Sequence, residues 1–304
     1  MSKVKKPDFH LINKTIKNIS QSKGVVLLSS QQAWDSYSWS RKFFKTRPEL
    51  GYFLWVKKTP PNSLSSCISL ADYGFEQKLV NLVVVEPRVK VKIKALCNAL
   101  ADNLSATHQG RSKIIVKKAG FLEVFHQHFW GGQDLVLPQL DFLLEDQAKL
   151  AYIYKNDKTP RRLEMKNSFS LQQGAKAESK LIIRAKKSQV KIKESLSLAG
   201  RDTCGNLILR LVGEEKSAIK AVSQITARQP SRGHLDCQGL LVDPQVKVSL
   251  TPKLVNFHNQ ALITHEASIG KIEKDQLEYL QSRGLSQAAA VNLIIRGFLN
   301  EKNN

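Results

Sequence analysis

The sequence predicts a mainly β protein, most of which is built from short, regularly spaced strands. From about residue 51 onward, short segments alternate apolar and polar residues, as half-buried strands do, and little helical pattern lies between them. Several segments consist of a strand, a tight polar turn and a second strand; examples are IIVKKAGFLEV, LIIRAKKSQVKI and LLVDPQVKVSL. Such strands are compatible with a sandwich, a barrel or a β-helix. Even spacing and the absence of Asn-Gly hairpin turns favour a solenoid.

The first region, residues 1–50, is expected to be helical. It is polar and aromatic, with helical patterns around Lys14–Gln21 and Gln32–Phe44. At Gly51 the pattern changes, because GYFLWVKK predicts a strand and the TPPN that follows predicts a turn. We therefore expect a β core over residues 51–270.

The last region, residues 271–304, has the clearest helical pattern. One face of a first helix carries Ile272, Gln276, Leu277 and Leu280. Gly284 predicts the end of that helix, and Ser286 is a good N-cap for the next. The second helix has an apolar stripe of Ala290, Leu293, Ile294 and Phe298. These stripes either pack on the strands or dock a partner, and polar helical ends suit a solenoid, whose terminal coils need caps.

Composition narrows the function classes. The formal net charge is +21, which is compatible with a nucleic-acid partner, an acidic protein partner or a solvated basic surface. No nucleic-acid-binding motif accompanies the charge, so we do not expect nucleic acid as the partner. No apolar run approaches the ~18 residues of a membrane helix, and MSKVKKPDF precedes no apolar segment. A cytoplasmic protein without membrane contact is expected.

Several kinds of site are excluded by their missing motifs. The four cysteines, Cys67, Cys97, Cys204 and Cys237, form no C-x-x-C pair, which argues against a zinc finger and a thioredoxin-like site. In a reducing cytoplasm they are expected to be free thiols. No G-x-x-x-x-G-K-[ST] loop and no G-x-S-x-G elbow is present, so neither ATP hydrolysis nor serine-hydrolase chemistry is expected of this chain.

His265 and Glu266 stand side by side in the last predicted strand. They do not form a zinc-protease motif, because the position of the second histidine is occupied by Ile269. Neighbours on a flat strand point to opposite faces, so both side chains bind one ion only at a bulge or a strand end. Cys237 lies 28 residues before His265, a plausible length for one solenoid coil, and residues one coil apart stack at about 4.8 Å. Thiolate, imidazole and carboxylate all bind iron, although an isolated cysteine is also a common core residue.

Cys97 ends a second pattern of interest. Alternate positions before it carry Val89, Val91, Ile93 and Ala95, which predicts an inward, shielded thiol. Cys97 and Cys237 would lie several coils apart, so they cannot share one small cluster. They could instead be two positions along one path through the solenoid. Cys67 and Cys204 lie in polar surroundings and are interpreted as incidental.

Three carboxy-terminal stretches resemble, in this order, the signature of the SufB/SufD family: GHLDCQGLLVD, THEASIGKIEKDQLEYLQSRGLS and AAAVNLIIRGFL. These proteins are scaffold subunits of the Suf iron–sulfur cluster assembly machinery. Earlier segments resemble the family more loosely, so that the resemblance runs from about residue 50 to the end. It implies a right-handed parallel β-helix core flanked by N-terminal and C-terminal helical regions. It also implies an assembly scaffold rather than an enzyme, with a transient iron–sulfur cluster as cargo, and it leaves open whether the complex uses a flavin.

The resemblance also implies roles for residues near the carboxy terminus. Cys237 matches the cysteine on which nascent clusters form in SufB, and Glu266 and His265 match its partners in the sequence HEA. The carboxy-terminal helices match the region that docks the SufC-type ABC ATPase. The residues of these helices that we expect to bind SufC are Ile272, Leu277, Leu280, Leu293, Ile294 and Phe298.

A sulfur route is implied as well. Cys97 matches the cysteine that receives sulfur from a SufE- or SufU-type donor, and His128 and Trp130 match a polar-x-Trp triplet that lines the path toward Cys237. The expected partners are therefore SufC, a second SufB- or SufD-type subunit in a homodimer or heterodimer, and a cysteine-desulfurase sulfur-transfer system. Two departures stand out: KALCNALAD lacks the usual glycine and proline, and no amino-terminal C-x-x-C-x-x-x-C is present. The chain is more similar to compact, archaeal-like members, and its Cys237 and Glu266 favour a SufB-like role.

Three alternatives remain. A SufD-like structural subunit would supply His265 to a cluster anchored elsewhere and bind SufC without a cluster of its own. A basic nucleic-acid-binding β-protein would show tight, salt-dependent binding. A carbohydrate-active β-helix enzyme would need a cluster of carboxylates on one face, and the 26 acidic residues do not recur at a coil-like interval.

Overall fold

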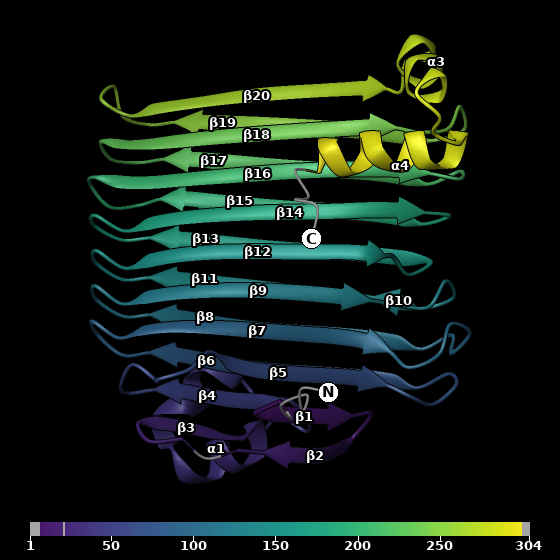
Figure 1. Ribbon diagram of the computed structural model, residues 1–304. Coiled ribbons are helices and arrows are strands. Elements are labelled where there is room, and N and C mark those ends of the chain that lie inside the picture. The colour runs from purple at the N-terminus through teal and green to yellow at the C-terminus, as the bar shows by residue number, and fades with distance from the viewer. Residues whose placement is uncertain (1–6, 21, 300–304) are drawn as a thin grey trace.

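The computed structural model describes residues 7–20 and 22–299 and has the form of a long β-solenoid with short helices near both ends (Figure 1). Within these residues the strands form two ten-stranded sheets, which we name sheet A and sheet B; in sheet B, β11 lies off the main path and pairs with β13 and β8. Through the core, successive strands alternate between the two sheets, so that one strand of each sheet makes up one coil. The predicted mainly β fold is confirmed, and among the three β architectures the solenoid is the one observed.

Sheet A provides eight parallel strands to the solenoid. In spatial order they are β5 (Leu64–Leu70), β7 (Lys90–Ala99), β9 (Phe121–Phe129), β12 (Lys149–Lys158), β14 (Lys176–Lys186), β16 (Thr203–Glu214), β18 (Ser231–Leu241) and β20 (Leu262–Lys271). The last strand, β20, pairs only with β18 and so forms the free edge of the sheet within the described chain.

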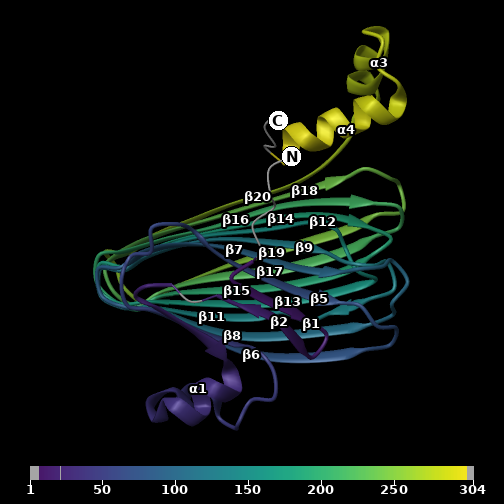
Figure 2. The same ribbon diagram turned by 60° about the horizontal axis from the view of Figure 1, so that its bottom comes forward.

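Sheet B faces sheet A across the interior (Figure 2). Its parallel strands are β4 (Tyr52–Val56), β6 (Glu76–Val85), β8 (Thr107–Val116), β10 (Leu135–Val136), β11 (Gln139–Leu144), β13 (Arg162–Leu171), β15 (Gln189–Leu198), β17 (Ala218–Ala227) and β19 (Lys247–Asn256). The chain therefore buries two continuous parallel sheets against each other, which explains its regular run of short apolar segments.

The tight polar turns join the two sheets instead of closing hairpins. In IIVKKAGFLEV, β8 of sheet B passes into β9 of sheet A. Ala119 in this turn has a left-handed φ of 56°, and its N–H donates to the carbonyl of Asp146 in the next coil at 2.8 Å. Gln147, with φ 58°, donates in the same way to Gln173 at 2.8 Å. The turns stack by these hydrogen bonds, which holds neighbouring coils in register.

The interior between the sheets, which we call the lumen, is filled by every second side chain of each strand. On β12, for example, Leu150, Tyr152, Tyr154 and Asn156 are buried and alternate with more exposed residues. Parallel strands pair in register, so inward residues of successive coils stack in rows. Most rows are aliphatic and form one core cluster along the solenoid. Polar side chains within these rows are therefore easy to recognise as exceptions.

The amino-terminal region contains strands as well as helices. Its elements are β1 (Phe9–Ile12), β2 (Thr15–Ile19), β3 (Val25–Ser29), α1 (Ser30–Ser36), the 3₁₀ helix η1 (Ser38–Ser40) and α2 (Arg41–Phe44). The helix expected at Lys14–Gln21 is wrong for its described residues, because β2 forms an antiparallel pair with β1, which in turn extends sheet A beside β5. Gln21 and residues 1–6 lie outside the described residues. The pattern Gln32–Phe44 coincides with α1, η1 and α2, which cover the outer face of sheet B (Figure 2).

The carboxy-terminal region contains α3 (Lys274–Ser282) and α4 (Gln287–Phe298). Gly284 follows α3 with a left-handed φ of 88°, and the Ser286 side chain accepts a hydrogen bond from the Ala289 N–H, as the sequence predicts. The apolar side of α4 packs on the outer face of sheet A, where Ile295 meets a cluster that includes Val212 and Leu240. In the described part of the chain, no helix has both the length and the apolar character needed to cross a bilayer.

Candidate functional site

The lumen holds two groups of polar side chains among its aliphatic rows. The first, the Cys97 cluster, consists of Cys97, His126 and His128, with Tyr152 and Tyr154 against it. The second, the Cys237 group, lies toward the carboxy-terminal end and consists of Asn167, Ser179, Glu194, Ser223 and Cys237. Both groups follow from in-register stacking, since one inward row of sheet A runs Ala95, His126, Tyr154, Leu181, Leu209, Cys237 and Ala267.

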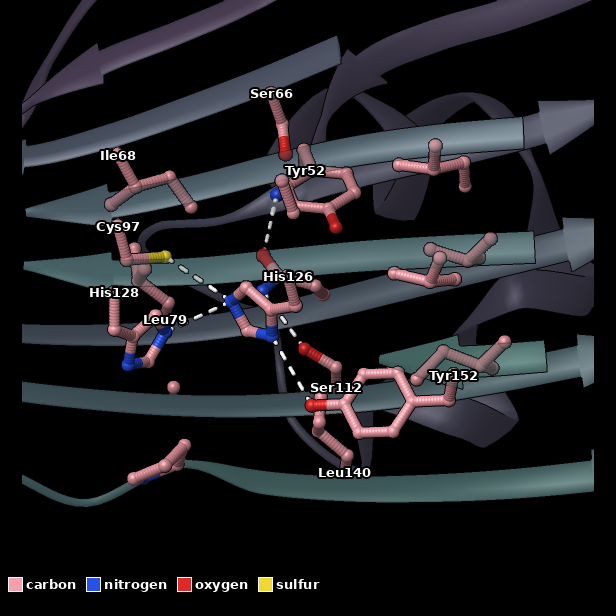
Figure 3. Close-up of a pocket in the computed structure, with 18 of the residues that line it drawn as sticks. Tyr52, Ser66, Ile68, Leu79, Cys97, Ser112, His126, His128, Leu140 and Tyr152 are labelled. Atoms are coloured by element: carbon pink, nitrogen blue, oxygen red, sulfur yellow. Dashed lines mark hydrogen bonds between the residues drawn. The ribbon is translucent and has the colours of Figure 1, made fainter. Parts of the chain in front are cut away.

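The Cys97 cluster brings three metal-binding side chains together (Figure 3). The Cys97 Sγ atom lies 3.6 Å from Nε2 of His126, and Nε2 of His126 lies 2.9 Å from Nε2 of His128. Cys97 and His128 are in-register partners on β7 and β9, and His126 lies two positions earlier on the same side of β9. Cys97 and His128 are buried, whereas His126 is half-buried.

Two tyrosine hydroxyls orient the imidazoles from the next coil. The Tyr152 hydroxyl lies 3.3 Å from Nδ1 of His126, and the Tyr154 hydroxyl lies 2.9 Å from Nδ1 of His128. The Asn156 side-chain amide donates to the Tyr154 oxygen at 3.1 Å. Each imidazole is thus held by its Nδ1 atom, which turns both Nε2 atoms toward each other and toward the thiol.

Burial sets the protonation of the cluster. It lowers the pKa of His126 to about 4 and that of His128 well below its ordinary value, so both imidazoles are neutral at pH 7. Burial also raises the pKa of the Cys97 thiol, and the nearby Cys67 adds to this rise. In the absence of a cation or another positive charge, Cys97 is therefore a thiol and not a thiolate.

Trp130 and His108 extend the cluster toward sheet B. The Trp130 ring centroid lies 5.3 Å from that of His128 and 4.9 Å from that of His108. The Trp130 indole N–H has no hydrogen-bond partner among the described residues, although the side chain is fully buried. His108 Nδ1 contacts Oε1 of Gln77 at 2.8 Å. The structure therefore brings together Cys97, His128 and Trp130, the three residues that the resemblance assigned to a sulfur route.

A cavity of about 70 Å³ adjoins the cluster. The polar side chains on its wall include Cys97, His126, His128 and Tyr152, and the remainder of the wall is mostly aliphatic. Because a water molecule occupies about 30 Å³ in the liquid, the cavity has room for a small ligand beside the three metal-binding atoms.

The sequence interpretation missed His126 and the two tyrosines. A signal was present, because His126, His128 and Trp130 alternate in HQHFW and must share one face of a strand. Tyr152 and Tyr154 likewise alternate in KLAYIYKN. Which row of one strand stacks on which row of the next depends on coil length, and this was not evident before the register was known.

Cys237 lies in the lumen one coil before the carboxy-terminal edge of sheet A. It is 2% exposed and stands in register with Leu209 on β16 and Ala267 on β20. Burial raises the pKa of its thiol to about 12, and the carboxyl groups of Glu194 and Asp236 add to the rise. Cys237 alternates with the buried Leu235 on β18, and both side chains point into the lumen.

His265 and Glu266 occupy opposite sides of β20. His265 pairs with Leu235, a buried core residue, and so has the inward orientation, while Glu266 pairs with Asp236 on the outer side. Both side chains are exposed, because β20 belongs to the last coil. The assumed coil of 28 residues is two residues short at this point, since Cys237 stacks on Ala267 and not on His265. β18 and β20 pair without a register shift, so no bulge turns Glu266 inward.

Glu194 is a buried carboxyl group between the Cys97 cluster and Cys237. Its Oε1 accepts hydrogen bonds from the Ser179 hydroxyl at 3.0 Å and from the Asn167 amide at 3.3 Å, whereas its Oε2 has no partner among the described residues. Burial raises its pKa to about 7. The sequence interpretation missed it, although a glutamate that alternates with Val190 and Ile192 in QVKIKES is an unusual inward residue.

The six residues expected to bind SufC differ in how much surface they offer. Three of them, Ile272, Ile294 and Phe298, pack against the apolar cluster on the outer face of sheet A. Leu277 and Leu280 on α3 are half-buried, and Leu293 on α4 is 44% exposed. The last residues of this region, 300–304, lie outside the described residues.

Comparisons with known proteins agree with the sequence resemblance. The chain is 24% identical to an iron-sulfur cluster assembly SufBD family protein of Methanothermobacter thermautotrophicus over 302 residues, which cover 91% of this chain and 74% of the relative. A SufBD family protein of Methanocaldococcus jannaschii is 29% identical over 244 residues, covering 77% of this chain and 75% of the relative. The iron-sulfur cluster assembly protein SufB of Bacillus subtilis is 24% identical over 236 residues, covering 72% of this chain and 48% of the relative.

A family model described as SUF system FeS cluster assembly, SufBD core domain, matches residues 71–298. This range includes the Cys97 cluster, the Cys237 group and both carboxy-terminal helices. With a solenoid fold, two polar groups in its lumen and a match over most of its length, the chain belongs to the SufBD core domain family of the SUF system of iron–sulfur cluster assembly.

Proposed function

We propose that the chain is a SufB-like scaffold on which a nascent iron–sulfur cluster is assembled at Cys237. The observation that carries the proposal is the place of Cys237, which points into the lumen one coil before the exposed last coil. A cluster bound there would lie near the rim of the solenoid, shielded on one side by the core and accessible from the other. Thiolate is the usual protein ligand of iron–sulfur clusters, and His265 lies on the inward side of the neighbouring strand. We further expect the solenoid to be right-handed, as in the family.

A second SufB- or SufD-type subunit would complete this site. The free edge of sheet A at β20 offers unpaired backbone groups, which favour pairing with another chain. Apolar side chains are exposed there as well, with Ile269 at 47% and Leu262 at 62%. Glu266 lies on the outer side of the same strand, so it would reach the cluster only after a bend in β20 or take part in the subunit contact instead.

Sulfur would reach Cys237 through the lumen. In this proposal the Cys97 thiol gives its proton to the neutral imidazole of His126 beside it. The resulting thiolate attacks the outer sulfur of a donor persulfide, takes that sulfur as its own persulfide and releases the donor's thiolate, which takes up the proton. His126 and Cys237 stand in one row of sheet A, and Glu194 lies between the two groups. His128 and Trp130 line the start of this route, and a cysteine-desulfurase system would supply the donor.

A SufC-type ATPase would dock on the carboxy-terminal helices. This region carries exposed apolar residues, among them Leu293 at 44% and Tyr279 at 59%. Because α4 packs on the outer face of sheet A, a movement of the helices would be transmitted to β14, β16 and β18. The ATPase, and not this chain, would provide the energy for that rearrangement.

A SufD-like structural role is the second candidate. It is favoured by the separation of Cys237, His265 and Glu266, which do not converge on one point, and by the raised pKa of Cys237. This role predicts binding of SufC without assembly of a cluster on the isolated chain.

Anaerobic reconstitution with ferrous iron and sulfide tests the two candidates. For a SufB-like scaffold we expect a visible chromophore and bound iron that disappear in Cys237→Ser and persist in the matched control Cys204→Ser, whose cysteine is half-buried on β16. Binding of SufC without a chromophore in any variant, also after addition of a second subunit, would favour the SufD-like role.

A further inference from the structure

The Cys97 cluster has a donor arrangement that a sulfur route alone does not require. Its three ligand atoms, one thiol sulfur and two imidazole nitrogens, all lie within 4.8 Å of one another. We propose that Cys97, His126 and His128 form a binding site for a divalent transition-metal cation, Zn²⁺ or Fe²⁺, inside the lumen. The site does not include Cys237, so this proposal can be tested independently of the cluster proposed at Cys237.

Two of the three separations between the ligand atoms are close to those of tetrahedral coordination, and the third is within 4.8 Å. With Zn–S near 2.3 Å and Zn–N near 2.05 Å, a tetrahedral cation sets the S···N separation at about 3.6 Å and the N···N separation at about 3.3 Å. The observed Sγ–Nε2 separation between Cys97 and His126 is 3.6 Å. The Nε2 atoms of His126 and His128 are 2.9 Å apart, so they need to separate by only a few tenths of an ångström.

The surroundings of the two imidazoles match those of metal ligands. A histidine that binds a metal usually has its second ring nitrogen fixed by a hydrogen bond, which orients the ring. Here Tyr152 and Tyr154 occupy these positions at the Nδ1 atoms, and Asn156 in turn holds Tyr154. Without a cation, a proton must lie between the two Nε2 atoms for their contact to be attractive. A cation would displace the thiol proton of Cys97, and the proton between the two Nε2 atoms would move to the Nδ1 atom of the same ring, where a tyrosine oxygen accepts the hydrogen bond.

The donor set determines which cations are suited. One thiolate and two imidazoles favour borderline and soft transition metals over Mg²⁺ and Ca²⁺, which prefer oxygen. No carboxylate belongs to the group of ligand atoms. The fourth coordination position would face the cavity of about 70 Å³, where a water molecule or an incoming sulfur ligand has room. Three protein ligands with one open position resemble a catalytic rather than a structural zinc site.

A cation at this site would affect the proposed sulfur route. Cys97 bound to a cation is a thiolate at neutral pH, whereas the empty site holds it as a thiol. The same bond occupies the sulfur atom, so a tightly bound cation would protect Cys97 from alkylation and from a donor persulfide.

Titration of the reduced, anaerobic full-length chain with Co²⁺ tests the proposal. Tetrahedral Co²⁺ with a thiolate ligand shows intense visible bands and a sulfur-to-metal charge-transfer band in the near ultraviolet. We expect one such Co²⁺ per chain, displaced by one equivalent of Zn²⁺. Separate dialysis against Zn²⁺ and Fe²⁺, followed by metal analysis, then shows which of these ions is held more tightly.

Three variants and two controls locate the ion. Cys97→Ser is expected to lose the charge-transfer band, and His126→Gln to weaken binding at least about 100-fold; Tyr154→Phe, which leaves all three ligands, is expected to weaken it about tenfold. Cys67→Ser is the matched control, because Cys67 lies on the adjacent strand in register with Leu96 and hence on the opposite face from Cys97. Cys237→Ser is the second control, and both are expected to bind Co²⁺ like the wild type.

The outcomes separate this proposal from the proposed function. Absence of a thiolate band in the folded wild type, or its persistence in Cys97→Ser, would overturn the metal site while leaving cluster assembly at Cys237 open. A band that is lost in Cys237→Ser but retained in Cys97→Ser would also overturn it and would assign the ion to the Cys237 group. Thermal unfolding of each variant verifies that a lost band does not reflect a lost fold.

Discussion

Cys237 on β18 stands in register with Ala267 on β20, and His265 lies two residues before Ala267 on the same inward side. Glu266, between them, pairs with Asp236 on the outer side. For the proposed cluster at Cys237, His265 is thus the better-placed second ligand. We expect His265→Ala to weaken iron binding during reconstitution by about tenfold or more, and Glu266→Gln by less than about threefold.

Bound iron per chain and the intensity of the visible chromophore measure both effects. Thr264→Ala is a suitable control, because Thr264 is exposed on the outer side of the same strand, where it contacts His234. An equal loss in Glu266→Gln and His265→Ala would mean that β20 bends when the cluster forms and brings both side chains to Cys237.

The reactivity of the four cysteines should follow their burial. Cys97 and Cys237 are buried, with raised pKa values, while Cys67 and Cys204 are half-buried. Because only the thiolate reacts, iodoacetamide is expected to modify Cys67 and Cys204 first. The two lumen cysteines are expected to react at least about tenfold more slowly. Peptide mass spectrometry of the chain after timed alkylation measures the four rates. Fast modification of Cys97 in the folded chain would indicate that the lumen opens readily at this coil.

The solenoid and the inward cysteines could be predicted because both depend on local alternation. Cys97 ends a same-side series of aliphatic residues, and Cys237 alternates with Leu235, so a strand of either sequence must turn the thiol toward the core. The turns were recognisable from their polar residues as well. These features need no knowledge of which strands are neighbours.

The features that could not be predicted from the sequence depend on contacts between distant segments. Whether Cys237 stacks on His265 or Ala267 is decided by the length of one coil, and two extra residues in the turn change the answer. The residues Thr15–Ile19 form a strand because β1 and β2 extend sheet A beside β5, a contact that their own short pattern does not encode. Similarly, His126 became part of the site only when Tyr152 and Cys97 were placed on either side of it.

The two kinds of apolar residue on α4 should separate packing from partner binding. Ile295 is fully buried against the outer face of sheet A, whereas Leu293 is 44% exposed. We expect Ile295→Ala to lower the free energy of unfolding by about 2–4 kcal/mol and Leu293→Ala to change it by less than about 0.5 kcal/mol. Urea unfolding measures both. If the exposed side of α4 binds SufC, Leu293→Ala should weaken the complex in a titration with SufC; unchanged affinity would place the docking surface elsewhere.

Glu194 should make the stability of the solenoid depend on pH. Burial raises its pKa to about 7 in the folded chain, compared with about 4.5 when the chain is unfolded. Between these values the Glu194 carboxyl group is protonated in the folded state and ionised in the unfolded state, so the contribution of Glu194 to stability is greatest below pH 4.5 and decreases as the pH rises through 7. A shift of this size corresponds to about 3 kcal/mol lost by pH 8.

Glu194→Gln removes the titrating group and keeps its shape, and it retains an oxygen that accepts from Ser179 and Asn167. The wild type should lose somewhat less than about 1 kcal/mol by pH 5 and about 3 kcal/mol by pH 8, so the variant should gain about 2–3 kcal/mol on the wild type between the two pH values. Comparing the two chains by urea unfolding at both pH values cancels the contribution of the buried histidines, which titrate alike in each. Glu178→Gln on the exposed side of β14 is the matched control and should show no such difference. If Glu194→Gln and the wild type differ equally at pH 5 and pH 8, folding does not raise the pKa of Glu194, and its carboxyl group is ionised at both pH values. A carboxyl group that takes up a proton near neutral pH could then no longer be invoked between the Cys97 cluster and Cys237.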